Sequence, residues 1–225
     1  MQELDKSPAS IGSMFSRIAS RYDLLNRVLS FNSDRRWRAR AVEELNGNSH
    51  RVLDLATGTG DFAIALSRAG KKVIGADFCL AMLSGAREKA DLPLSAADAL
   101  ALPFPDASFD AVTVGWGVRN FADLGRGLAE MRRVIRPGGT VLILEFSQPS
   151  GFAGALYRFY SDRILPWIGG VLSGDRAAYR YLNRSARAWP GSRGMIRVLE
   201  GAGFVDIRAI PLAFGAIAIH HGKKP

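Results

Sequence analysis

The chain has 225 residues, of which 48% are hydrophobic, and a formal net charge of +9, which is enough apolar material for one buried core of ordinary size. Its single cysteine, Cys79, excludes an internal disulfide framework and favours a reducing compartment. We recognise no signal peptide and no apolar run of the ~18 residues that a membrane span needs, and we therefore expect a cytoplasmic protein.

The excess of positive charge lies in the last third of the chain. Residues 148–225 contain 11 basic and 4 acidic side chains, whereas residues 51–147 contain 11 of each kind. A field of this sign favours an anionic partner, either a nucleic acid or a lipid surface.

Helical patterns come first along the chain, and strands then alternate with helices. The two N-terminal helices are predicted at 11–29 and 34–45, with Asp34 placed to cap the second. The later elements are expected, in order, as a strand at 51–56, a helix at 61–69, a strand at 72–77, a helix at 80–90, strands at 93–97 and 109–115, a helix at 123–135, a strand at 140–146, helices at 152–165, 176–188 and 192–201, and strands at 204–210 and 214–220.

This alternation indicates a parallel sheet with right-handed crossovers, to which the last two strands, joined around Pro211–Gly215, add antiparallel pairing. We predict an α/β fold: a doubly wound, mostly parallel, Rossmann-like seven-stranded sheet with N-terminal helices and a helical insertion after the fifth strand. We expect a single domain with four parts: a helical lid at 1–50, a cofactor-binding core at 51–147, a helical region facing substrate or membrane at 148–202, and C-terminal strands at 203–225.

A glycine-rich turn follows the first strand and indicates a nucleotide site. Residues 51–61 read RVLDLATGTGD, and the next strand ends at Asp77, which is placed to accept hydrogen bonds from a ribose diol. Gly58 and Gly60 allow a tight turn and a close approach of the backbone to a ligand. The turn lacks the third glycine of a dinucleotide site. Asp54 and Asp61 would repel a phosphate. We count Asp54 among the cofactor-binding candidates. S-adenosylmethionine, a sulfonium that bears a ribose, fits this loop.

Two later loops supply further candidates. Asp98 follows the third strand, where its carboxylate is placed to meet an adenine amino group. The loop Gly115–Phe121 follows the fourth strand at the carboxyl edge of the sheet, where open α/β sheets bind their ligands, and presents Arg119 and Asn120. On position alone, pairing of Arg119 with a surface acid is an equally good interpretation.

Two segments, Tyr22–Trp37 and Arg133–Ser147, resemble the signature blocks of the quinone-pathway C-methyltransferases, which methylate the ring of demethylmenaquinone or of a ubiquinone precursor. The stretches at 118–121 (VRNF) and 179–185 (YRYLNRS) are similar to the same family, so the resemblance covers nearly the whole chain. It implies a class I S-adenosylmethionine-dependent methyltransferase. The cofactor contacts that it implies are Thr57, Asp77, Asp98 and Ala99.

The chain departs from the family pattern at three positions. Asp34 stands where the family usually has a histidine, Arg136 where it has a lysine, and Gly115 where it often has a serine that contacts the cofactor. At Gly115 only the backbone can make that contact.

The reaction implied by the resemblance moves a methyl group to a ring carbon of a reduced naphthoquinol. A guanidinium stays protonated in proteins, so Arg119 is expected to stabilise the developing phenolate or to orient a water that Asn120 holds. On the first predicted helix, Asp23 is the better candidate for accepting the proton, and Tyr22 is the better candidate for packing against the substrate ring. The alternative is that Tyr22 and Asn26 only pack within the lid.

The histidines and the cysteine are assigned no chemistry. His50, His220 and His221 are interpreted as surface residues, no metal site is expected, and Cys79 is interpreted as a packing residue.

A nucleic-acid methyltransferase and a non-catalytic scaffold of a quinone-biosynthesis complex remain as rival functions. The loop after the fourth strand lacks an NPPY-like motif, which argues against the first, so no nucleic-acid partner is expected. A homodimer is compatible with the sequence. Between the two quinone pathways we favour menaquinone.

The expected substrate carries a polyprenyl tail, so we predict transient contact of the C-terminal third with an anionic membrane surface. Arg176, Arg180, Arg184 and Arg187 fall within one arc of a helix. An apolar helical stripe upstream, suited to shallow insertion or to lining a groove for the tail, comprises Phe152, Ala155, Leu156, Phe159 and Tyr160, followed by Pro166, Trp167 and Ile168.

Overall fold

The computed structural model describes residues 5–45, 47, 49–149, 151, 154, 163 and 176–225, without the side chains of 176, 177, 179 and 180. The helix expected at 152–165 and the apolar stripe from Phe152 to Tyr160 with Pro166–Ile168 therefore lie, apart from residues 154 and 163, outside the described residues. Among the described helices, none is long and apolar enough to cross a bilayer.

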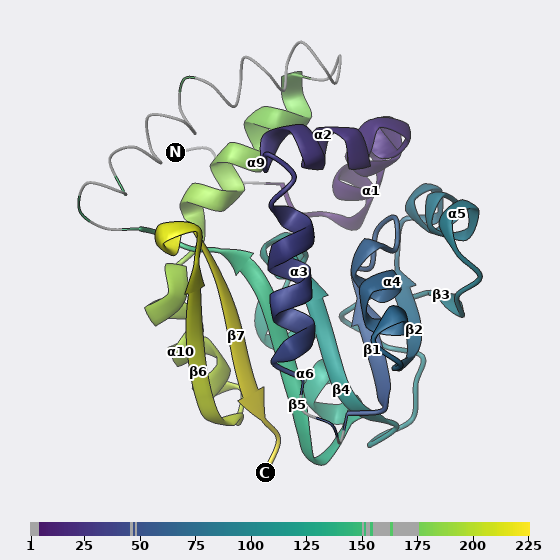
Figure 1. Ribbon diagram of the computed structural model, residues 1–225, viewed down its shortest axis with the longest axis vertical. Helices are drawn as coiled ribbons and strands as arrows, with labels where there is room; N and C mark the ends of the chain where they lie inside the picture. The colour runs from purple at the N-terminus through teal and green to yellow at the C-terminus, as the bar shows by residue number, and fades with distance from the viewer. Residues whose placement is uncertain are drawn as a thin grey trace.

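Seven strands form one sheet in the order β3-β2-β1-β4-β5-β7-β6 (Figure 1). Every strand pair is parallel except those made by β7, which runs antiparallel to both β5 and β6. The strands are β1 Arg51–Leu55, β2 Lys72–Asp77, β3 Leu94–Ala96, β4 Phe109–Gly115, β5 Ile135–Phe146, β6 Val205–Leu212 and β7 Ile217–Lys223. The predicted fold class and the C-terminal antiparallel hairpin are confirmed.

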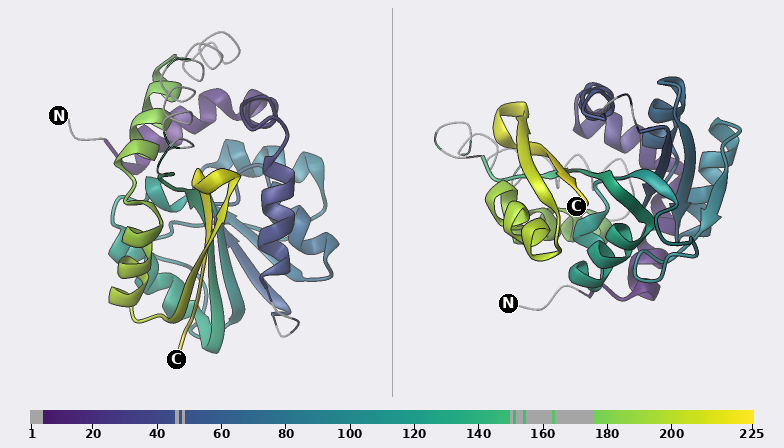
Figure 2. Two further views of the ribbon diagram at one scale, coloured as in Figure 1. Left: turned by 60° about the vertical axis from the view of Figure 1, so that its left-hand side comes forward. Right: turned by 90° about the horizontal axis from the view of Figure 1, so that it is seen from below.

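Helices cover both faces of the sheet (Figure 2). The described helices are α1 Pro8–Ile18, α2 Tyr22–Leu29, α3 Asp34–Glu43, α4 Asp61–Arg68, α5 Leu80–Lys89, α6 Leu124–Val134, α9 Arg176–Ala188 and α10 Gly191–Gly201, with short 3₁₀ turns η1 Ala19–Arg21, η2 Val118–Asn120 and η4 Ala213–Gly215. Side chains of α6 and α10 pack in one apolar cluster with the strands, and side chains of α3 and α4 pack in a second.

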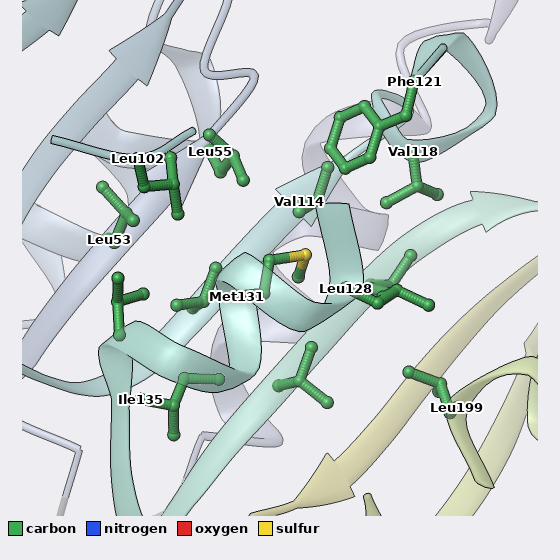
Figure 3. Packing of buried hydrophobic residues seen from close by; sticks show 14 of the residues in the cluster. Leu53, Leu55, Leu102, Val114, Val118, Phe121, Leu128, Met131, Ile135 and Leu199 are labelled. Atoms are coloured by element: carbon green, nitrogen blue, oxygen red, sulfur yellow. The ribbon is translucent and has the colours of Figure 1, made fainter. Parts of the chain in front are cut away.

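The core on the α6 side is built from leucines of β1 and the apolar stripe of α6 (Figure 3). Leu53 and Leu55 lie against it from the sheet, and Leu128 and Met131 from α6, all fully buried or nearly so. The strands at the centre of the sheet are apolar on both faces because helices cover both sides. This packing holds the carboxyl ends of β1, β2 and β4 at fixed positions.

The N-terminal helices differ from the expectation in two ways. The predicted helix 11–29 is divided by η1, so α1 and α2 are separate helices. Asp34 does not cap α3: it is the first residue of that helix, and the capping position is occupied by Ser33 without a side-chain cap bond. Its buried carboxylate instead pairs with Arg27 and Arg38, because two guanidinium partners compensate a buried charge better than backbone N–H groups.

The interpretation of His220 and His221 as surface residues is wrong. Both side chains are buried, and only His50 is exposed. His220 and His221 lie on β7 between β5 and β6, and their side chains point to opposite faces of the sheet. α10 packs on β7, and Ile217 and Ile219, which share the face of His221, belong to the same apolar cluster as α3 and α4. Burial lowers the pKa of both imidazoles, that of His220 to about 4.

Candidate functional site

The turn between β1 and α4 is built from residues with left-handed backbone. Ala56, Gly58 and Gly60 have φ values of 52°, 57° and 82°. A Cβ at Gly60 would lie 3.1 Å from the Cβ of Ala86 on α5, so a larger side chain there has little space. The backbone thus turns sharply at the carboxyl end of β1 and leaves the surface above Gly58 without a side chain.

Asp77 ends β2 directly beside this turn. Its Oδ2 accepts the backbone N–H of Gly58 over 2.9 Å, and its Oδ1 accepts that of Cys79 over 2.9 Å. Burial raises the pKa of Asp77, and the two backbone N–H groups oppose that shift. A carboxylate has about four lone-pair sites, so Asp77 keeps acceptor capacity for a diol while the turn holds it in place.

Asp54 and Thr57 lie behind the turn. The hydroxyls of Thr57 and Thr113 donate to the two oxygens of Asp54 over 2.6 and 2.8 Å, and Asp54 is fully buried. Burial raises the pKa of this carboxyl to about 6. The arrangement ties the turn to β1 and β4, so both residues shape the loop from behind; direct contact of either with a cofactor stays a prediction.

A cavity opens where β1, β2 and β4 end, against α1 and α2. Of the predicted site residues, its wall includes Tyr22, Gly58, Asp77, Asp98, Ala99 and Asn120. It is otherwise mostly apolar and aromatic, with Phe15, Phe78, Trp116 and Phe121. Among the described residues on this wall there is one lysine, Lys6, and burial lowers its pKa. A mostly apolar and aromatic wall with a few polar groups, among them Asp77 and Asp98, suits a nucleoside beside a flat apolar ring.

Asp98 stands on the wall after β3. Its Oδ1 accepts the backbone N–H of Leu100 over 2.9 Å, which leaves its second oxygen for a ligand. Ala99 lies next to it on the same wall. The position fits the expected contact with an adenine amino group.

Arg119 lies next to the cavity but outside the residues of its wall. Its Nη1 donates to both oxygens of the fully buried Glu145, over 3.0 and 3.2 Å, and also to the carbonyl of Trp116. Its guanidinium carbon stands 5.0 Å from the centroid of the Phe146 ring. Arg119 therefore pairs with an acid, as one interpretation held, but with a buried one, and its role in the chemical step stays a prediction.

Asn120 is the polar residue of η2 that faces the cavity. The hydroxyl of Tyr181, on α9, donates to its Oδ1 over 3.1 Å. This bond uses one of the two lone pairs of Oδ1 and neither donor of the amide NH₂. Tyr181 was not predicted as a site residue, since only tertiary packing brings α9 against η2.

Tyr22 and Asp23, neighbours on α2, point in different directions. Tyr22 lines the cavity and meets Phe15 edge to face, with ring centroids 6.1 Å apart. Asp23 instead accepts a hydrogen bond from the Thr59 hydroxyl over 2.6 Å and pairs with Lys89. The structure thus brings Tyr22 to the site as expected and places Asp23 in an ion pair that ties α2 to α5.

Three further residues at the site were missed by the sequence analysis. Glu145 had a signal, because it lies in the second signature block, but no partner could be assigned to it. Tyr181 likewise lies in the stretch 179–185 that resembles the family, but its partner could not be assigned from the sequence. Lys6 had no signal, because it is distant in sequence from the glycine-rich turn. Gly60 and Thr57 stand in the turn as predicted, outside the cavity wall. Among the described residues no group of acidic, histidine and cysteine side chains is placed to bind a metal.

Comparison with known proteins places this architecture in a sequence family. The model of the ubiE/COQ5 methyltransferase family matches residues 1–224. A demethylmenaquinone methyltransferase of Thermus thermophilus is 50% identical over 221 residues, covering 94% of this chain and 100% of that protein. A demethylmenaquinone methyltransferase of Deinococcus radiodurans is 48% identical over 229 residues, covering 98% of this chain and 94% of that protein.

Solved structures share the fold at low sequence identity. A SAM-dependent methyltransferase from Thermotoga maritima, described as a possible histamine N-methyltransferase, superposes with a TM-score of 0.71 at 21% identity and covers 95% of this chain and 99% of its own. A phosphoethanolamine N-methyltransferase of Haemonchus contortus, in complex with S-adenosylhomocysteine, has a TM-score of 0.55 at 17% identity, covering 79% of this chain and 49% of its own.

Proposed function

The chain belongs to the ubiE/COQ5 methyltransferase family, and from this premise we propose that it methylates a ring carbon of demethylmenaquinol to give menaquinol, the last step of menaquinone biosynthesis. Its cofactor is S-adenosylmethionine. The equivalent C-methylation of a ubiquinone precursor is the second candidate. Menaquinone is favoured because relatives that match nearly the whole chain at 50% and 48% identity are demethylmenaquinone methyltransferases.

The observation that carries the proposal is one cavity whose wall combines the carboxylates of Asp77 and Asp98 with aromatic rings. The residues present fit S-adenosylmethionine: Asp77 keeps free lone pairs for the ribose, Asp98 keeps one oxygen for the adenine amino group, and the turn at Gly58 leaves room for the ligand. When bound, this cofactor supplies an electrophilic methyl group.

The residues of the chain position the ring and help to ionise it. A phenolic hydroxyl titrates near 10, so a donor aimed at its oxygen favours the phenolate, which raises electron density on the neighbouring ring carbon. The NH₂ of Asn120, a side chain on the cavity wall, is our candidate for such a donor. The buried guanidinium of Arg119 adds positive potential, while Tyr22 and Trp116 provide flat walls.

The experiment that tests the proposal compares acceptors directly. Pure protein is incubated with methyl-labelled S-adenosylmethionine and demethylmenaquinol, the corresponding ubiquinone precursor, or bulk RNA. We expect label in the menaquinol. Label in the benzoquinol alone would move the assignment to the ubiquinone pathway, and label in RNA alone would replace it with a nucleic-acid methyltransferase. Absence of turnover with cofactor bound would support a scaffold.

We also propose that the C-terminal third contacts an anionic membrane surface, as the charge distribution suggests. Arg184 and Arg187 are exposed on α9, whereas the side chains of Arg176 and Arg180 lie outside the described residues. Each exposed arginine near an anionic leaflet contributes about 1 kcal/mol, which falls with added salt. Replacing Arg184 and Arg187 with glutamine should therefore weaken binding to anionic vesicles, and unchanged binding would assign the arginine face another role.

A further inference from the structure

α2 has one face toward the cavity and another toward solvent. Tyr22 lines the cavity and Leu25 is buried. The opposite side presents Leu24, Val28 and Phe31, whose side chains are 58%, 36% and 76% exposed. Their spacing of four and three residues places them along one side of the helix and of the turn that follows it. We refer to these three residues as the outer stripe.

The outer stripe is held outward by the backbone. Phe31 follows the end of α2 with a φ of 51°, in the left-handed region. Its N–H donates to the carbonyl of Val28 over 3.2 Å, and the N–H of Asn32 donates to that of Arg27 over 2.7 Å. Arg27 in turn pairs with Asp61 on α4 over 2.6 Å, which fixes the turn to the core. The exposure of Phe31 is therefore a property of an anchored turn.

Positive charge lies beside the outer stripe. Arg35 and Arg36 follow it along the chain and are exposed. The neighbouring acids are neutralised within the protein, because Asp23 pairs with Lys89 and the buried Asp34 pairs with two arginines. An apolar stripe flanked by arginines matches an anionic lipid surface, in which acyl chains lie beneath negative headgroups.

A second exposed aromatic residue lies at the same end of the sheet. Phe214, in η4, is 92% exposed, and the strands that flank η4 meet where β5 ends, since Leu212 and Phe146 both pair with Ile217. Figure 1 shows α2, α9 and the yellow turn between β6 and β7, which contains η4, at the same end of the sheet. The ends of β1, β2 and β4 line the cavity there. Val205, 44% exposed, lies at the opposite end of β6, where it pairs with Lys223.

We propose that the outer stripe of α2 inserts into the headgroup–acyl boundary of an anionic bilayer, so that the helix whose inner face lines the cavity brings the cavity to the membrane. The choice of a lipid-borne substrate rests on the proposed function; the membrane contact itself rests on the stripe and its arginines. With α2 in the interface, a polyprenyl quinol passes from the bilayer to the cavity without exposing its tail to water.

Vesicle binding tests the contact without reference to activity. The probes are phosphatidylcholine vesicles with and without about one third phosphatidylglycerol. We expect the wild-type protein to sediment with the anionic vesicles, and the variant Leu24→Ser/Val28→Ser/Phe31→Ser to bind them at least about tenfold more weakly, since apolar burial is lost. Val205→Ser, which replaces one exposed apolar residue by serine at the opposite end of β6, should bind the vesicles like the wild-type protein. The proposal would be overturned if the triple variant bound the vesicles as well as the wild-type protein. It would also be overturned if the wild-type protein did not bind vesicles but self-associated, and the triple variant did not self-associate.

Activity on two substrates separates membrane delivery from catalysis. The triple variant should bind cofactor like wild type in calorimetry and methylate a tailless demethylnaphthoquinol in solution at the wild-type rate, while turnover of the polyprenyl quinol in vesicles falls at least about tenfold. Equal losses on both substrates would mean that the stripe serves only the fold. If the wild-type protein methylates neither quinol yet binds vesicles through the stripe, the proposed function fails while the membrane contact stands.

Discussion

The hydroxyl of Tyr181 donates a hydrogen bond to Oδ1 of Asn120 over 3.1 Å. This contact joins α9 to the loop after β4 across 61 residues of sequence. It uses one lone pair of the Asn120 oxygen and leaves the amide NH₂ as the donor of this side chain on the cavity wall. We predict that this NH₂ donates to the oxygen of a bound ring.

Removing the Tyr181 hydroxyl should affect the chemical step. In Tyr181→Phe the Asn120 amide loses its orienting bond, worth about 1 kcal/mol, so kcat should fall about three- to tenfold. Cofactor affinity, measured by calorimetry, should stay within error, because Tyr181 is not on the cavity wall. As a comparison, Asn120→Asp replaces the donor with an acceptor and should lower kcat further and shift its pH dependence. A Tyr181→Phe enzyme with wild-type kcat would show that Asn120 needs no orientation.

Arg119 and Glu145 should contribute separately to stability and to catalysis. Arg119→Ala leaves the fully buried Glu145 carboxylate without its partner and should lower the free energy of unfolding by about 3–5 kcal/mol. The variant Arg119→Met/Glu145→Gln removes both charges and should regain most of that stability in denaturant titrations. We expect kcat in the double variant to stay about a hundredfold low while cofactor affinity is nearly intact. Recovery of kcat along with stability would assign Arg119 a structural role only.

Asp77 should dominate cofactor binding. Asp77→Ala removes the acceptor for the ribose and the partner of two backbone N–H groups, so affinity for S-adenosylmethionine should fall by about 1.5–3 kcal/mol, or about 10- to 150-fold. Calorimetric titration measures this directly, with Asp91→Ala, an exposed carboxyl, as the matched control. Wild-type affinity in Asp77→Ala would exclude Asp77 as the ribose ligand.

His220 should make stability depend on pH. Burial lowers its pKa in the folded state from 6.5 to about 4, so the unfolded chain binds more protons between these values. The contribution of His220 to the free energy of unfolding is therefore complete above about pH 6.5. It falls by up to about 3 kcal/mol as the pH is lowered toward 4. Asp54, whose folded pKa of about 6 is raised, contributes in the opposite direction in part of this window.

Substitution isolates the histidine term. His220→Leu should reduce the slope of unfolding free energy against pH between about 4 and 6.5 by up to one proton, about 1.4 kcal/mol per pH unit. Parallel pH profiles for wild type and His220→Leu would contradict a neutral, buried His220.

The sequence by itself determined the sheet and the glycine-rich turn beside Asp77. The predicted bounds of β2 and β4 are confirmed at Lys72–Asp77 and Phe109–Gly115, and those of β1, β3, α4, α5 and α6 lie within one residue of the observed ones. β5 begins at Ile135, five residues before its predicted start at 140. These features are local: hydrophobic period, glycine turns and the position of Asp77 at the end of β2 are all set within about 30 residues, the length of a βαβ unit.

Tertiary structure alone decided what each charged or polar side chain meets. Asp34 was predicted to cap a helix, but its carboxylate pairs with Arg27 and Arg38. His220 was predicted to be exposed, but it is buried on β7, between β5 and β6. Glu145 and Arg119, 26 residues apart, and Tyr181 and Asn120, 61 apart, meet only when separate elements reach the same end of the sheet. The local sequence pattern predicts which face of a helix or strand is apolar. The partner of a buried charge comes from a distant part of the chain and compensates that charge only once the chain has folded.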